Sequence, residues 1–197
     1  KVLRLGRRVY NNGHMQDRLR DICERLTVPV ADMVRAVVTR WISILPVFQR
    51  AIQLEQPLRE LVNDPLFNRE KKRMLRKYEL SAMEMQVLSE VATLLELAED
   101  AIKHMSESEV CLIWQVIPIY DVYIDELDET IVDHSKLKVT RAIAARMRAV
   151  AVKYYSKTDN NRVMRIAISA LVLLSLQMNT DMFASFCPIL QDGILHQ

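Results

Sequence analysis

Histidine, cysteine and the carboxylates are the residue types of this 197-residue chain that could hold a metal ion. The four histidines are His14, His104, His134 and His196. They lie far apart, and none stands at ligand spacing from a cysteine. Three aspartates, Asp121, Asp125 and Asp128, recur at i, i+4 and i+7 and would share one face of a helix. Because no further oxygen ligands oppose them, we expect a solvated surface rather than a cation site.

Catalytic motifs are missing from the sequence. The 3 glycines are too few to build a phosphate-binding loop, and neither an HExxH nor a CxxC pattern occurs. Cys23, Cys111 and Cys187 are odd in number and widely spaced, which favours free thiols in a reducing compartment. The sequence therefore predicts no self-contained catalysis and no cofactor in this chain.

The distribution of positive charge is the feature that indicates a function, namely binding to a polyanion. Residues 1–77 hold 17 basic and 8 acidic side chains, residues 78–135 hold 1 and 14, and residues 136–197 hold 9 and 3. This segregation suggests that the ends of the chain face nucleic acid. Alternatively, the acidic middle packs against the basic flanks and neutralises them.

Two basic clusters are candidate contacts for DNA. The first comprises Arg69, Lys71, Lys72, Arg73, Arg76 and Lys77. The second lies in residues 136–157, which contain no acid, and Lys138, Arg141 and Arg148 share one side of the expected helix there. Arg146, Lys153 and Lys157 share another side, and the stripe expected to be buried between them is Ile143, Met147, Val150 and Tyr154. These cations either bind phosphates or pair with the preceding acidic helix.

Helices must position both clusters. The low content of Gly and Pro, with 10 Met and abundant Leu, Ala, Glu and Arg, predicts an all-α fold. We expect a multi-helix bundle of about seven to nine helices, with at most one short isolated strand near residues 33–39, where β-branched residues gather. Such a strand either has its partners outside the sequence or is docked in an irregular way. No apolar run reaches the ~20 residues of a membrane span.

Several local signals fix where these helices begin and end. The Asn11-Asn12-Gly13 tripeptide predicts a stop in the left-handed conformation. Pro46 and Pro57 predict helix starts or kinks. Ser81 followed by Glu84 has the spacing of a capping box.

Four segments resemble elements of hAT-family transposases. Thr39-Arg40-Trp41 resembles the family's TRWNST segment, and residues 80–103 resemble the helix after its insertion loop. Residues 116–120 resemble its VLPLY element. Lys153-Tyr154-Tyr155, followed by Thr158-Asp159 and Ile166-Ala167, resembles its KYY, TD and IA pattern. The order and spacing of these segments fit over roughly residues 2–170.

This resemblance implies a piece of an RNase H-like transposase. Residues 1–40 would be the end of the catalytic core or its remnant, and residues 41–197 an α-helical insertion-like domain. Trp41 would support a base flipped out near the transposon end, with Arg40 beside it; the alternative is that Trp41 packs in the core. The family's acidic triad would lie outside this sequence, so no catalytic residue is assigned. A divalent metal such as Mg would belong to the catalytic core of the longer parent.

The sequence also departs from the family. Ile42-Ser43-Ile44 stands where the family has Asn-Ser-Thr, and the LDPRYK pattern is missing after Ser169. These changes suggest a degenerate or domesticated copy. We therefore expect a DNA-contacting helical domain, nuclear and not catalytic on its own, with a possible homo-oligomer or protein partner and no membrane association. The alternative is a domesticated helical protein–protein scaffold without DNA binding.

Overall fold

The chain folds into helices in every regularly structured part that the computed structural model describes, namely residues 1–37, 43–69, 74–106, 115–159, 161–162, 166 and 169. The α-helices in these ranges are α1 (Val2–Tyr10), α2 (Gly13–Arg25), α3 (Ile44–Gln53), α4 (Glu55–Asn63), α5 (Ala82–Met105), α6 (Val116–Val132) and α7 (Lys138–Asp159). Two short 3-10 helices, η2 (Pro65–Phe67) and η3 (Arg76–Tyr78), lie between α4 and α5. The all-α prediction is confirmed, with seven described α-helices at the low end of the expected range.

Contacts divide the chain into two compact units, Lys1–Glu96 and Leu97–Gln197. The predicted domain boundary between residues 40 and 41 falls inside the first unit. Residues 38–42 lie outside the described ranges, so the assignment of residues 1–40 to an RNase H-like core stays a prediction. No helix in the described part of the chain is both long and apolar enough to cross a membrane.

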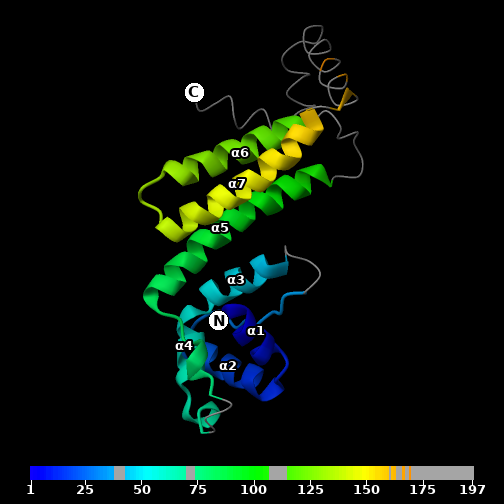
Figure 1. Cartoon of the computed structure of the whole chain (residues 1–197). Coiled ribbons are helices and arrows are strands. Elements are labelled where there is room, and N and C mark those ends of the chain that lie inside the picture. Colours follow the sequence, from blue (N-terminus) through cyan, green and yellow to red (C-terminus); the bar gives the residue numbers. More distant parts are fainter. Residues whose placement is uncertain are drawn as a thin grey trace. The chain divides into compact units, whose positions relative to one another are not determined.

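The first unit contains helices α1 to α4 (Figure 1). Each of these helices contributes an apolar stripe to one core cluster. Its fully buried side chains recur at helical spacing, as Leu5 and Val9 do on α1 and Leu19 and Ile22 on α2. Leu61 of α4 joins the same cluster. Burying one such side chain contributes about 1.5–3 kcal/mol, so the hydrophobic pattern predicted from the sequence is what holds these helices together.

Helix ends in the first unit confirm two predictions and correct one. Ser81 and Glu84 form the predicted capping box: the Ser81 amide donates to Glu84 Oε2 at 3.0 Å, and the Glu84 amide donates to Ser81 Oγ at 3.2 Å. Helix α1 ends at Tyr10, as the Asn11-Asn12-Gly13 tripeptide predicted. The predicted left-handed conformation is wrong, since neither asparagine nor Gly13 has a positive φ. Instead, Asn12 Oδ1 accepts a hydrogen bond from the Met15 amide at 3.2 Å and begins α2.

No strand forms over residues 33–37, the described part of the predicted strand. Side chains, rather than a neighbouring strand, accept hydrogen bonds from its backbone amides. The Met33 amide donates to Gln16 Oε1 at 3.2 Å, and the Val37 amide donates to Ser43 Oγ at 2.7 Å. The irregular docking that the sequence left open is therefore what occurs. It depends on Gly6, where a Cβ atom would lie 3.1 Å from both the Met33 Cε and the Val34 carbonyl oxygen.

In the second unit, α6 and α7 pack side by side as an antiparallel hairpin (Figure 1). The rings of Tyr120 and Tyr155 meet edge to face with centroids 6.1 Å apart at one end. The Arg141 guanidinium lies 2.9 Å from His134 Nδ1 at the other. One side of each helix is thereby turned toward its neighbour.

The buried line of α7 differs from the predicted stripe. Thr140, Ala144 and Ala151 are buried, whereas Val150 and Tyr154 are 56% and 51% exposed. The prediction was wrong for these two residues because small side chains, rather than the largest apolar ones, allow two helices to approach closely. Alanines lie on several sides of α7, so the hydrophobic pattern alone did not identify the side that faces α6.

Candidate nucleic-acid interface

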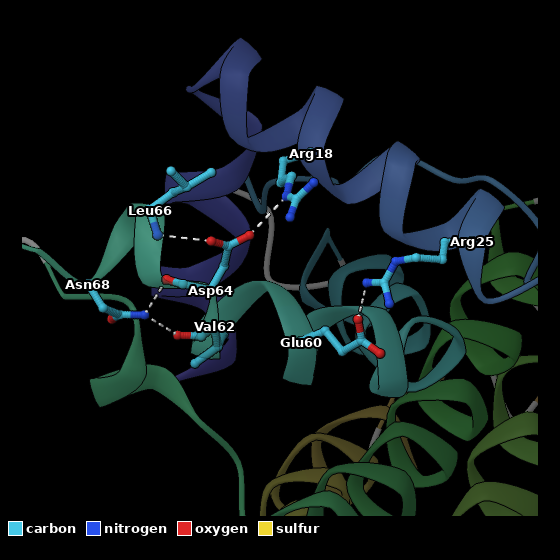
Figure 2. Close-up of polar contacts among 7 residues, drawn as sticks. All are labelled: Arg18, Arg25, Glu60, Val62, Asp64, Leu66 and Asn68. Carbon is cyan, nitrogen blue, oxygen red and sulfur yellow. Dashed lines mark hydrogen bonds and ion pairs between the residues drawn. The ribbon is translucent and has the colours of Figure 1, made fainter.

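The segment before the first basic cluster is anchored by a buried carboxylate, Asp64, at the end of α4 (Figure 2). Its side chain is 7% exposed, and its Oδ2 accepts a hydrogen bond from Arg18 Nε of α2 at 2.8 Å. Its Oδ1 accepts from the Leu66 amide at 2.9 Å, which begins η2. Burial raises the pKa of Asp64, but the hydrogen bonds from Leu66 and Arg18 together outweigh burial, so the pKa lies below its ordinary value.

Asn68 then ties the two ends of the basic segment together. Its Nδ2 donates to the carbonyl oxygens of Val62 and Asp64, both at 2.8 Å (Figure 2). Its Oδ1 accepts from the Arg76 amide at 3.0 Å. Arg76 Nε also donates to Asn63 Oδ1 at 3.0 Å. Residues 68 and 76 are thus held at the base of one loop, which emerges from the C-terminal end of α4.

The described cations of this loop are exposed. Arg69 and Arg76 reach solvent, and Lys77 Nζ lies 5.1 Å from the centre of the Tyr78 ring. No carboxylate of the described residues forms an ion pair with any of these three side chains. Lys71, Lys72 and Arg73 lie outside the described residues, as do Arg40 and Trp41. The predicted roles of these five residues stay predictions.

Of the three cations predicted to share one side of α7, Arg148 contacts α6 and Arg141 contacts the loop that follows α6. Arg148 Nε donates to Asp128 Oδ1 at 2.5 Å, a hydrogen bond that raises the pKa of Arg148. Arg141 bonds to His134, and its Nε is buried without a partner among the described residues. Lys138 is exposed. For Arg148, the structure shows the alternative that the sequence left open, pairing with the preceding acidic helix.

The three cations predicted to share the other side of α7 are all accessible to solvent. Arg146, Lys153 and Lys157 are exposed, and none forms an ion pair with a described carboxylate. Lys157 Nζ instead lies 5.5 Å from the centre of the Tyr154 ring. Arg146 stands two positions before Arg148, about 200° around the helix from it. The spacing of Thr140, Ala144 and Ala151 was the sequence signal that could have identified the outward side.

A set of cations that the sequence analysis did not name as candidate contacts lies at the start of the chain. Arg4 and Arg7 of α1 are exposed, with no ion pair to a described carboxylate. The guanidinium of Arg35 lies 5.2 Å from the centre of the Tyr10 ring. By contrast, Arg20 of α2 pairs with Asp32 at 2.6 Å. The free cations therefore lie on particular elements, while others are neutralised within the fold.

The described carboxylates do not form a metal site. The described residues contain no group of three His, Cys, Asp or Glu side chains close enough to hold an ion. In the Asp121, Asp125 and Asp128 row, Asp128 accepts from Arg148, and the other two are exposed. Compared with known proteins, the chain matches no family model, no curated protein and no solved structure.

Proposed function

We propose that this chain is a DNA-contacting helical domain of a hAT-like transposase or of a protein derived from one, not catalytic on its own. The single observation that carries the DNA-binding part is the outward side of α7. Arg146, Lys153 and Lys157 lie exposed there, without an ion pair to a described carboxylate, on a segment (138–157) that contains no acid. Cations left unpaired in water are those that can displace counterions from a nucleic-acid backbone.

The three side chains suit a backbone rather than a base edge. They lie within residues 146–157, whose ends are about 16 Å apart along the helix axis. Duplex DNA carries a negative charge every ~1.7 Å of its axis. Phosphate contacts of this kind fix position without reading sequence. Specificity would come from elsewhere, and the resemblance to hAT transposases assigns that role to Arg40 and Trp41, with stacking worth ~1–3 kcal/mol per base.

The test is the salt dependence of duplex and hairpin DNA binding, measured by fluorescence anisotropy. The triple variant Arg146→Gln, Lys153→Gln, Lys157→Gln is expected to lower the slope of log K against log salt by up to ~3, since each phosphate contact contributes about 0.9. The control is Arg20→Gln, because Asp32 already neutralises that guanidinium. Absence of binding at low salt would overturn the proposal.

Exposed apolar side chains on the same hairpin favour the second candidate, a protein-association scaffold. Val132 at the end of α6 is 69% exposed and Val139 at the start of α7 is 55% exposed. Covering exposed valine side chains with a partner removes apolar surface from water, which favours association. Binding of a protein partner together with no DNA binding at any salt concentration would select this candidate.

A further inference from the structure

Helices α6 and α7 carry opposite charge, apart from Asp159 at the C-terminal end of α7. The acidic side chains of α6 are Asp121, Asp125, Glu126, Asp128 and Glu129, and residues 116–132 contain no Lys, Arg or His. The basic side chains of α7 are Lys138, Arg141, Arg146, Arg148, Lys153 and Lys157, and residues 138–157 contain no acid. The hairpin thus carries one acidic helix and one basic helix side by side.

The hairpin neutralises little of this charge internally. Among the described residues, Arg148–Asp128 is the one ion pair between α6 and α7. Asp125 and Glu129 are exposed one helical turn apart, and neither forms an ion pair with a described cation. Arg146 and Lys153 are exposed on the side of α7 that points away from α6. These two surfaces therefore cannot reach each other within one hairpin.

Apolar side chains lie within both charged surfaces. Val122 and Val132 flank the acidic pair at i−3 and i+3 and are 48% and 69% exposed. On α7, Val150 lies between Arg146 and Lys153 at helical spacing and is exposed. A surface with a row of one charge beside exposed valines resembles the e and g positions beside a coiled-coil seam, where opposite charges choose the partner.

We infer that the acidic surface of α6, defined by Val122, Asp125, Glu129 and Val132, docks on the basic surface of α7, defined by Arg146, Val150 and Lys153, in a second copy of this chain. Charge complementarity identifies a second copy as the partner, because every copy carries one acidic surface and one basic surface, each with two charged side chains. The inference does not rest on DNA binding, although DNA and a second copy would compete for the same cations.

The geometry also sets the kind of assembly. Because the two surfaces lie on different sides of the hairpin, the contact joins unlike surfaces of the two copies. Such a heterologous contact leaves one free acidic surface and one free basic surface after two copies have joined. Further copies can then add until the assembly closes into a ring or grows as an open filament. Assembly is therefore expected to grow with protein concentration and to disappear in high salt, where the Debye length shrinks from about 10 Å at 0.1 M to about 3 Å at 1 M.

Sedimentation velocity of the unmodified chain tests this first, with no variant needed. At about 0.1 M salt the weight-average mass is expected to rise with concentration, and at about 1 M salt it is expected to fall to that of the single chain. A single chain at both salt concentrations, up to the highest soluble concentration, would overturn the inference.

Two double variants then locate the contact. Asp125→Asn with Glu129→Gln removes the acidic surface without creating a second basic one, and Arg146→Gln with Lys153→Gln removes the basic surface. Each variant alone is expected to stay a single chain in low salt. Mixed together, they retain one intact acidic and one intact basic surface, so they should form a 1:1 pair and stop there.

The matched control is Asp21→Asn with Glu24→Gln on α2, which makes the same two substitutions as the α6 variant on exposed residues of the other unit. It is expected to assemble like the unmodified chain. Assembly that survives both α6 and α7 variants, or a mixture that stays unpaired while circular dichroism shows each variant folded, would refute the docking of α6 on α7.

Discussion

Asp64 is the side chain whose loss should most clearly reveal how the loop before the first basic cluster is held. The Asp64 carboxylate accepts hydrogen bonds from the Leu66 amide at 2.9 Å and from Arg18 Nε at 2.8 Å (Figure 2). Replacing Asp64 by Ala leaves both donors without this acceptor. Glu60, which pairs with Arg25 on the same two helices, provides a matched control.

The expected cost follows from burial. Loss of an acceptor at the start of a helix costs about 0.5–2 kcal/mol. A hydrogen bond to a charged group contributes ~1.5–3 kcal/mol, and the lower end applies because the Arg18 side chain is 39% exposed and can rehydrate. We therefore expect Asp64→Ala to lower the free energy of unfolding by about 2–4 kcal/mol. Glu60→Ala should cost ~0–1 kcal/mol, since the Arg25 side chain is 60% exposed.

The assay is urea unfolding followed by circular dichroism, with hydrogen exchange of α2 and α4 as the local measurement. An equal cost for the two variants would refute the reasoning, because it would mean that burial of the Asp64 carboxylate does not matter. Unchanged exchange in both helices after Asp64→Ala would refute it as well.

The pH dependence has a definite sign. The pKa of Asp64 is lower in the folded chain than in the unfolded one, where it is about 4. Its contribution to stability is therefore complete above about pH 4 and is lost as the pH falls through the folded pKa. The stability difference between the unmodified chain and Asp64→Asn should shrink over that acidic range and stay constant above it.

Two further predictions concern backbone packing and the indole of the hAT-like segment. Gly6→Ala should lower stability by about 1–3 kcal/mol by overpacking, despite a helix propensity gain of ~1 kcal/mol, because a Cβ there meets Met33 and Val34. Gly13→Ala, where nothing lies within 4 Å, is the control in the same urea experiment, and equal stability of the two variants would contradict the close approach. If Trp41 stacks on a flipped base, Trp41→Ala should weaken hairpin DNA binding by ~1–3 kcal/mol at an unchanged melting temperature. A large drop in melting temperature would instead place that indole in the core.

Local signals predicted the first unit well. The apolar spacing on α2 and the Ser81–Glu84 capping box depend on neighbours within a few residues, so the sequence was sufficient for both. Residues 33–37 were not predictable in the same way. Their β-branched side chains favour an extended backbone, but a strand also needs a neighbouring strand, and Gln16 and Ser43 take its hydrogen bonds instead.

The candidate interface shows the same division. The sequence located every cation of residues 138–157 and left open whether the acidic helix would pair with them. Which cations point outward depended on the register of α6 against α7, which turns Arg148 toward Asp128 and Arg146 toward water. The hydrophobic pattern alone did not distinguish the two, because alanine and valine lie on nearly every side of α7.

By itself, the amino-acid sequence determined that this chain is helical, that α5 begins after Ser81, and that the charge is divided into blocks. These properties follow from backbone propensity, capping and composition, which act over one or two helical turns. Tertiary structure alone decided that Asp64 is buried on Arg18, that Gly6 admits residues 33–34, and that α7 presents Arg146, Lys153 and Lys157. The physical reason is that the burial and pairing of a side chain depend on which distant segment packs against it.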